Sequence, residues 1–425
     1  MKKYENYKDS GLEWLGMVPE HWEIMRLKSC SSIILGKMLM SIPPKGQEAN
    51  YSLEKYLKSK NVGWLNLCLD DNAVEEMFFN ETEKELYKLR EGDIVMNEGG
   101  DIGKVALWHD TGYDCYIQNS INKITSSNGV IPAFLTYYLY SVSMSGYFWS
   151  IVSQISIAHL TKEKLANTPI ILPPLTEQRT IASYLDQKVG QIDALISEKG
   201  KMVEDLKAYR SSLITETVTK GLDKEVEMKD SGVEWIGKMP KDWKLLKLKR
   251  IVNLKSGTTL TSDRILDEGK YQVFGGNGPR GYIDDYTNEG NFVLIGRQGA
   301  LCGNINYANG KFWATEHAII CYPLKDIDTI WLGETLRAMN LNQYSISAAQ
   351  PGLAVERINE LLIPTPSISE QKEISSYLKL RIIQIESAIS EQEHQLSDLK
   401  SYKSSLITEA VTGKIDLRDW QTKKS

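Results

Sequence analysis

Two glycine-rich stretches have residue types that could bind a nucleotide. Residues 276–281, Gly-Asn-Gly-Pro-Arg-Gly, satisfy the GxGxxG pattern of dinucleotide-binding folds. Such a site needs a helix to begin within the motif, so that its N-terminus faces the pyrophosphate. Here Pro279 lies inside the pattern, and residues 282–287 have turn and strand character. We therefore interpret the stretch as a glycine-rich recognition loop.

The second stretch, residues 99–105, resembles a phosphate-binding loop but has one residue too few between its glycines. It also lacks the Ser or Thr that would hold magnesium. Glu370-Gln371-Lys372 could end a nuclease carboxylate motif, but its copy at Glu177-Gln178-Arg179 indicates a structural role. The sequence contains no HExxH, no GxSxG and no aromatic tetrapeptide of an amino-methyltransferase. We predict no catalytic residues and no metal site.

The elements that would position these loops are encoded twice. Residues 8–28 recur as 229–249, and residues 177–223 recur as 370–416, where 24 of 47 aligned positions are identical. The two intervening regions show no comparable match. A repeated frame around variable regions indicates a two-fold scaffold that presents two different binding surfaces. Tryptophans recur in the shorter repeat and are interpreted as core residues, with a partner surface as the alternative: Trp14, Trp22, Trp235 and Trp243.

Both copies of the longer repeat have the apolar spacing of a long helix, in steps of three, four and seven that are typical of a coiled coil. About 40 residues at 1.5 Å each give a rod of roughly 60 Å, and short connections favour an antiparallel pair. The predicted packing residues are Ile181, Leu185, Ile192, Leu206 and Leu213 in the first helix and Ile374, Leu378, Ile385, Leu399 and Leu406 in the second.

The variable regions, roughly 20–173 and 240–366, have mixed α and β character. Residues 92–100 and 290–299 are each an apolar strand that enters a glycine turn, and residues 309–323 also predict a strand. An amphipathic helix is predicted over residues 134–148.

Composition describes an ordinary globular chain of 425 residues with a net charge of −5, which argues against a uniformly basic surface. The run 241–255 is locally basic, and we interpret it as a solvated face rather than a DNA-binding patch. Five scattered cysteines, no secretory signal and no apolar run of ~20 residues predict a cytoplasmic protein without disulfides, zinc or a membrane partner.

Two half-repeats of a variable domain and a long helix resemble the specificity subunit of a type I restriction-modification system. The most specific elements are residues 173–186 and 212–223 with their copies. Residues 273–286, 292–317 and 349–364 are similar to target recognition domains of that family. The resemblance covers essentially the entire chain.

The resemblance implies an α+β fold with a pseudo-two-fold internal repeat. Two globular, mixed α/β target recognition domains would be separated by two long helices packed as an antiparallel coiled coil. The predicted divisions are 1–173 (first recognition domain with the N-terminal repeat segment), 174–225 (first spacer helix), 226–366 (second recognition domain with its repeat segment) and 367–425 (second spacer helix and C-terminal tail).

The implied function is phage defence through DNA recognition. Each variable domain would read one half of a bipartite, asymmetric target in double-stranded DNA, and the helices would set the half-site spacing. The chain itself would be non-catalytic and would bind no cofactor. Two methylation subunits would supply S-adenosylmethionine and adenine N6 chemistry, and two restriction subunits would supply ATP- and Mg²⁺-dependent cleavage.

Base discrimination requires polar side chains that loops present to the major groove. Candidates of these types are Asn97, Lys104, Gln118, Asn119 and His159 in the first domain and Asn277, Arg280, Arg297, Gln298, Lys311 and His317 in the second. Each could instead be a solvated or backbone-bonding residue. Two alternatives from other classes also fit the sequence: a coiled-coil scaffold without DNA specificity, and a nucleotide-binding enzyme that uses one of the glycine-rich loops.

Overall fold

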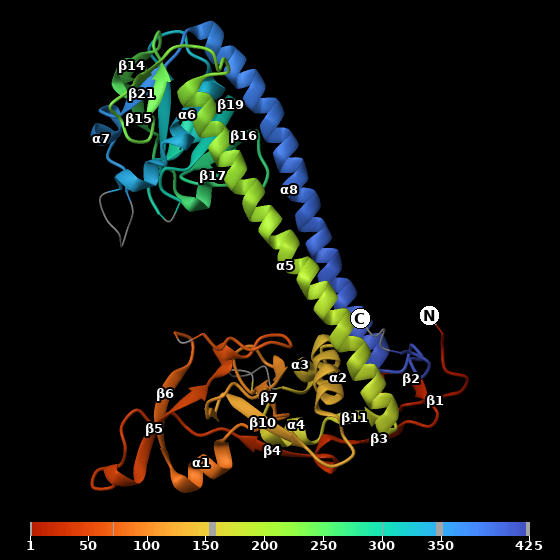
Figure 1. The fold of residues 1–425 in the computed structure, drawn as a ribbon. Helices are drawn as coiled ribbons and strands as arrows, with labels where there is room; N and C mark the ends of the chain where they lie inside the picture. Colours follow the sequence, from red (N-terminus) through yellow and green to blue (C-terminus); the bar gives the residue numbers. More distant parts are fainter. Residues whose placement is uncertain (1, 71, 153–158, 300, 346–351, 422–425) are drawn as a thin grey trace. The chain divides into compact units, whose positions relative to one another are not determined.

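The computed structural model divides the chain into two compact units (Figure 1). The residues that it describes are 2–70, 72–152, 159–299, 301–345 and 352–421. The first unit contains residues 1–198 and 395–425, and the second contains residues 199–394. Each unit therefore holds one globular domain and a part of each long helix, whereas the sequence predicted the helices as separate segments.

The first unit contains a four-stranded sheet, a three-stranded sheet, the hairpin β1-β2 and a two-stranded sheet of β3 with β11. Its strands are β1 (Tyr7–Asp9), β2 (Met17–Pro19), β3 (Glu23–Arg26), β4 (Ser31–Leu35), β5 (Tyr51–Leu57), β6 (Glu75–Asn80), β7 (Ile94–Asn97), β8 (Val105–Leu107), β9 (Tyr116–Ile117), β10 (Ile121–Ser126) and β11 (Pro169–Leu172). Its helices are α1 (Glu81–Tyr87), α2 (Pro132–Met144), α3 (Tyr147–Ile151), α4 (Lys162–Ala166) and the first half of α5 (Leu175–Lys220). The larger sheet has the order β4-β10-β7-β8, and the smaller has the order β6-β5-β9.

Helix α2 corrects one prediction from the sequence. It lies in the region expected to form an amphipathic helix, but residues 134–143 are all buried. It packs against β8 and β10, while the Tyr137 hydroxyl donates to Asp186 of α5 at 2.9 Å. A helix enclosed by a sheet and by another helix has no solvent-facing stripe, which explains the missing polar face.

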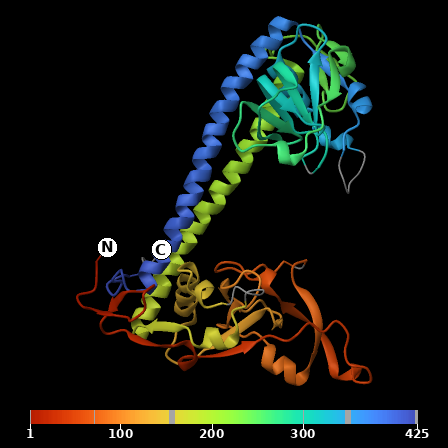
Figure 2. The same ribbon diagram turned by 180° about the vertical axis from the view of Figure 1, so that it is seen from behind.

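The second unit is built around one six-stranded sheet with the order β15-β20-β18-β19-β16-β17. Its strands are β12 (Met228–Asp230), β13 (Lys238–Pro240), β14 (Lys244–Lys247), β15 (Val252–Ser256), β16 (Tyr271–Gly275), β17 (Gly278–Ile283), β18 (Asn288–Gly296), β19 (Ile305–Ala314), β20 (Ala318–Pro323) and β21 (Leu362–Thr365). Its helices are α6 (Thr329–Ala338), α7 (Val355–Asn359) and the first part of α8 (Ile368–Val411). Helix α6 packs on β18 and β19, and Ile214 and Val218 of α5 join the same core. The C-terminal end of α5 (green) enters this unit beside its sheet (Figure 2).

The strand predicted over residues 309–323 is in fact two strands, β19 and β20. The chain turns at residues 315–317, where Ala318 N donates to Thr315 O at 2.9 Å. This turn allows β20 to pair with β18 in the middle of the sheet. The turn residues Thr315, Glu316 and His317 are polar, and this interruption of the apolar pattern was the available signal.

The long helices pack antiparallel within each unit, as predicted. In the first unit Lys403 of α8 pairs with Asp193 of α5 at 2.7 Å. In the second, Lys207 of α5 lies 3.4 Å from Glu393 of α8. Of the predicted packing residues, Ile181, Leu185, Ile192, Ile374, Leu378, Ile385 and Leu406 are buried, and Leu206, Leu213 and Leu399 are half-buried.

Repeated tryptophans fasten the short repeat segment to the start of each long helix. Trp22 and Trp243 are buried, which confirms their interpretation as core residues. The Trp22 indole N–H donates to Glu177 at 3.2 Å, and that of Trp243 donates to Glu370 at 3.1 Å. These bonds give the repeated glutamates the structural role that the repetition indicated.

The repeated glutamines fasten the globular domain to the same helix start. Gln178 accepts a hydrogen bond from Ile131 N at 2.8 Å, and Gln371 accepts one from Asp328 N at 3.0 Å. Ile131 and Asp328 are the N-cap residues of α2 and α6. Each glutamine therefore fixes the first turn of its domain helix.

Candidate nucleic-acid interface

The loops at the end of β18 form the most organised polar cluster of the second unit. Arg297 N donates to His317 O, and Leu353 N donates to Arg297 O, both at 2.9 Å. Gly296 N donates to Asn304 O at 2.8 Å. These bonds bring the loop after β18, the turn before β20 and the segment before α7 together at one end of the sheet.

The end of β7 in the first unit has the same three backbone hydrogen bonds. Glu98 N donates to Ser120 O at 2.9 Å, and Leu160 N donates to Glu98 O at 2.7 Å. Asn97 N donates to Lys104 O at 2.9 Å. The two variable regions therefore share one backbone frame although their sequences do not match. In this frame Glu98 corresponds to Arg297, and Ser120 corresponds to His317.

Glycines allow the backbone to come close enough for this frame. Gly36 and Gly257 stand 221 residues apart, as do the copies of the short repeat. A Cβ atom at Gly36 would overlap the carbonyl oxygen of Gln118, and one at Gly257 would overlap that of Ala314. Any other residue would push these strand ends apart, so glycine is required at both positions.

Four predicted residues of the second unit meet in the cluster. The Arg297 guanidinium donates to Ser256 Oγ at 3.2 Å. Gln298 Oε1 lies 3.1 Å from His317 Nδ1. Asn277 accepts a bond from the Asn304 amide at 3.0 Å. Asn277, Gln298 and His317 are thereby held at the sheet end together with Arg297.

Arg280 and Lys311 occupy other positions. Arg280 is exposed on β17 and packs beside Gly275. Lys311 lies on β19 opposite Glu289, at the other end of β18 from Arg297. Its Nζ is 4.5 Å from the centre of the Tyr286 ring, and Tyr286 and then Glu289 raise the pKa of this lysine. Lys311 is therefore a strand residue rather than a loop residue.

Asn97 is a correction to the predicted set. Its side chain is fully buried, and Nδ2 donates to Ser59 O at 3.1 Å. A buried amide with this partner cannot reach a base edge, because the protein itself covers it. Asn97 instead links the β7 turn to the segment after β5.

The other candidates of the first unit surround Glu98. His159 is exposed, and its Nδ1 lies 2.8 Å from Glu98 Oε2. Gln118 donates to Asn119 Oδ1 at 2.5 Å, and Lys104 pairs with Asp101 at 2.5 Å. Glu98 is absent from the predicted set, which contains basic residues, amides and histidine but no carboxylate. Its place directly after a strand and before two glycines was the available signal.

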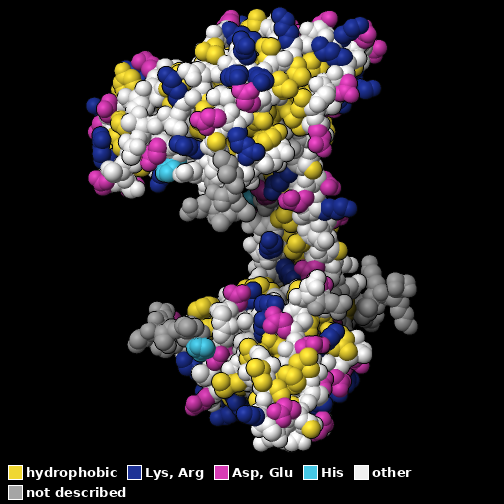
Figure 3. Space-filling view, turned by 90° about the vertical axis from the view of Figure 1, so that its left-hand side faces the viewer, with side chains coloured by type: hydrophobic (Ala, Val, Ile, Leu, Met, Phe, Trp, Pro, Cys, Tyr) yellow, Lys and Arg dark blue, Asp and Glu magenta, His cyan; other side chains and the backbone are white. Residues whose placement is uncertain are grey.

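Three cations of the basic run, Lys241, Lys247 and Lys249, pair with acids. Lys247 lies 2.6 Å from Glu360, which also pairs with Lys249. The two lysines lower the pKa of Glu360 to about 2. On the face shown in Figure 3, basic side chains of each unit are interspersed with acidic ones. These pairs fit a solvated face rather than a continuous basic patch.

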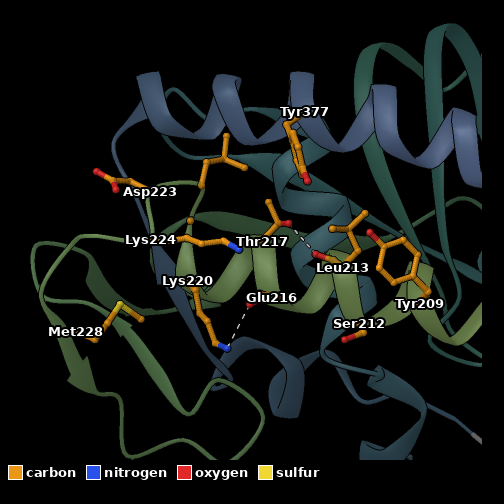
Figure 4. Close-up of a pocket in the computed structure, with 12 residues that line it drawn as sticks. Tyr209, Ser212, Leu213, Glu216, Thr217, Lys220, Asp223, Lys224, Met228 and Tyr377 are labelled. Atoms are coloured by element: carbon orange, nitrogen blue, oxygen red, sulfur yellow. Dashed lines mark hydrogen bonds and ion pairs between the residues drawn. The ribbon is translucent and has the colours of Figure 1, made fainter.

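Neither glycine-rich stretch contains the start of a helix. Residues 278–283 form strand β17, so no helix begins in the GxGxxG pattern. A cavity of about 560 Å³ in the second unit lies at the C-terminal end of α5, where Tyr209, Lys220 and Tyr377 are among its lining residues (Figure 4). The glycine-rich stretches do not contribute to it. Within the described part of the chain, no group of His, Cys, Asp or Glu could hold a metal, and no helix is long and apolar enough to cross a membrane.

The sequence profile of a family described as "Type I restriction modification DNA specificity domain" matches residues 19–204 and 240–394. The chain belongs to this family. It is similar to the MjaVIII specificity subunit of Methanocaldococcus jannaschii, with 25% identity over 98% of this chain and 97% of that protein. It is also 42% identical to the EcoprrI specificity subunit of Escherichia coli over 135 residues, which are 31% of this chain and 34% of that protein. The chain is thus a type I restriction-modification specificity subunit, whose role is DNA recognition.

Solved structures show the same fold. One, described as "Structural basis underlying complex assembly and conformational transition of the type I R-M system", has a TM-score of 0.72 at 16% identity and covers 94% of this chain and 99% of that chain. The HsdS subunit from Thermoanaerobacter tengcongensis has a TM-score of 0.50 at 17% identity and covers 94% of this chain and 98% of that chain. The predicted fold class is confirmed.

Proposed function

We propose that the two globular domains each read one half of a bipartite, asymmetric site in double-stranded DNA. The observation that supports this most directly is the shared backbone frame with different side chains at its loop positions. Glu98 in the first unit corresponds to Arg297 in the second, because both residues make the same backbone hydrogen bonds. A protein that recognises two unrelated half-sites needs such an arrangement, because the frame sets the approach and the side chains select the bases.

The long helices set the spacing between the half-sites. Helices α5 and α8 have 46 and 44 residues. A helix has a fixed rise per residue, so its length is a means of fixing a distance along DNA. Half-sites read from one face of a duplex favour a separation of about one helical turn, ~34 Å.

The same helices dock two methylation subunits. Buried residues that recur in both helices are explained by packing, but exposed residues that recur need another reason. Tyr209 and Tyr402 occupy the same repeat position and are 47% and 52% exposed. Other exposed pairs are Ser212 with Ser405 and Glu216 with Glu409. A partner that binds twice provides that reason.

Docking can be tested by the subunit stoichiometry of the purified complex, measured by native mass spectrometry. Tyr209→Ala and Tyr402→Ala should each lose one methylation subunit. Leu195→Ala is the control, because Leu195 is 46% exposed on α5 but its repeat counterpart is alanine. Two bound subunits in both tyrosine variants would rule out this surface.

The catalytic chemistry belongs to the partner subunits. The methylation subunits bind S-adenosylmethionine and methylate adenine N6, and two restriction subunits use ATP and Mg²⁺ for cleavage. The chain binds no cofactor and acts in the cytoplasm. Its own contribution is the choice of DNA sequence.

A nuclease footprint of the chain assembled with its methylation subunits tests the proposed function. Two protected half-sites separated by an unread spacer are expected on one sequence. A coiled-coil scaffold without DNA specificity would give no sequence-dependent protection. Nucleotide binding by the chain alone, measured by isothermal titration, would favour the enzyme alternative.

A further inference from the structure

One position of the shared frame has opposite charges in the two units. Glu98 follows β7 and Arg297 follows β18, and each is fixed by equivalent bonds to the turn before the next strand and to the segment beyond the loop. The side chains on either side also differ. Gly99 and Ser120 in the first unit stand where Gln298 and His317 stand in the second.

Both side chains keep unused hydrogen-bonding capacity. Glu98 Oε2 is bound to His159, whereas Oε1 receives no hydrogen bond from any residue that the structure describes. The Arg297 guanidinium donates through Nη1 to Ser256, and within the described residues its other N–H groups have no acceptor. The Glu98 side chain is 12% exposed; its carboxylate is oriented by His159 and has one oxygen without a donor among the described residues. The Arg297 guanidinium is oriented by Ser256 and has N–H groups without an acceptor among the described residues.

The opposite charges restrict what these groups can contact on DNA. Phosphates repel a carboxylate, so an acidic side chain at this interface is favourable only where it meets an amino group. In the major groove cytosine N4 is such a donor, and glutamate or aspartate is its usual partner. Arginine instead matches O6 and N7 of guanine, with two parallel bonds.

We propose, building on the proposed function, that this frame position is a base-reading position in both units. Glu98 accepts a hydrogen bond from the N4 amino group of a cytosine in the first half-site. Arg297 donates to O6 and N7 of a guanine in the second half-site. His159 and Ser256 are positioning residues that hold the two side chains in place.

The test uses the chain assembled with its methylation subunits on a plasmid library with randomised half-sites, and it maps methylated sites by sequencing. Glu98→Ala should lower the preference for one C·G pair of the first half-site by ~5-fold to ~100-fold, the usual range for one base contact. Arg297→Ala should do the same at one G·C pair of the second half-site. All other positions should keep their preference.

The conservative variant Glu98→Gln predicts a change of the preferred base rather than a loss of preference. It also keeps the proposal testable if Glu98→Ala does not fold. A glutamine both donates and accepts, so the preferred base should move from cytosine towards adenine. Glu91→Gln is a matched control, because Glu91 pairs with His109 at 3.1 Å just before β7 begins. Lys325→Ala, at the far end of β20 from His317, is the control for Arg297.

Two outcomes would overturn the proposal. One is an unchanged half-site in Glu98→Ala and Glu98→Gln, and the other is a uniform loss of methylation on every sequence. The latter indicates a phosphate contact or a folding role. A different result would contradict the proposed function itself: methylation by the unaltered complex at sites that share no bipartite sequence.

Discussion

Replacing Gln178 should loosen the first recognition domain from the start of α5. The Gln178 side chain is 1% exposed and makes three hydrogen bonds. Its Oε1 accepts from Ile131 N at 2.8 Å, and Nε2 donates to Pro173 O at 2.8 Å and to Gly129 O at 3.1 Å. A net ~1 kcal/mol for each bond predicts that Gln178→Ala lowers the free energy of unfolding by about 3 kcal/mol.

Gln371 provides an internal comparison in the second unit. Its side chain is 2% exposed and has two such bonds, to Asp328 N and Pro366 O. Gln371→Ala should therefore cost about 2 kcal/mol. Gln178→Ala should therefore lower the free energy of unfolding more than Gln371→Ala does, because three backbone groups lose their partner instead of two.

Urea unfolding and amide hydrogen exchange measure the effect. The Ile131 amide should exchange about 100-fold faster in Gln178→Ala, because 1.4 kcal/mol corresponds to a factor of ten. Gln191→Ala, on the exposed face of α5, should stay within ~0.5 kcal/mol of the unaltered chain. If Gln178→Ala leaves both the Ile131 exchange rate and the free energy of unfolding within that margin, Gln178 does not hold the first turn of α2 on α5.

Three further predictions concern DNA binding, spacing and pH. Arg297→Ala and Lys311→Ala should weaken DNA binding of the assembled complex more than Glu316→Gln does, because only the first two remove a positive charge. Gel-shift titrations at fixed salt measure the affinities, and a greater loss of affinity in Glu316→Gln would contradict this prediction. Deleting four residues, about one turn, from the middle of α5 should change the half-site spacing and leave both half-sites intact, as long-read methylation mapping would show. The pKa of Glu360 is about 2 against an ordinary 4.5, so its contribution to stability is present above pH 4.5 and is lost as the pH falls towards 2. The urea midpoint of Glu360→Gln should therefore fall less between pH 5 and pH 3 than that of the unaltered chain. An equal fall in both midpoints would show that the pairs with Lys247 and Lys249 do not stabilise the fold.

The repeated parts of the fold could be predicted because their physical signals are local. The heptad spacing of α5 and α8 and the duplicated tryptophans describe the helices and their contacts directly. The amphipathic character expected for α2 was wrong, because enclosure between a sheet and α5 is a tertiary property. The turn at residues 315–317 was also missed, although the polar run Thr315-Glu316-His317 interrupts the apolar pattern there and Ala318 N closes the turn on Thr315 O.

The candidate site could be predicted only in part. Glycine turns after apolar strands correctly indicated the ends of β7 and β18. Which side chains face outwards depends on the frame: Asn97 is buried, and its amide donates to Ser59 O in the segment after β5. The correspondence of Glu98 with Arg297 could not be seen from the sequence, because matching backbone bonds rather than matching residues establish it.

Mapping of the adenines that are methylated by the complex of this chain with its methylation subunits shows whether each domain reads its own half-site. The unaltered complex should modify one bipartite, asymmetric sequence with a fixed spacer. Replacing residues 240–366 with those of another specificity subunit should change the second half-site and leave the first half-site unchanged. A single contiguous target, or a change in both half-sites, would contradict the assignment of one half-site to each domain.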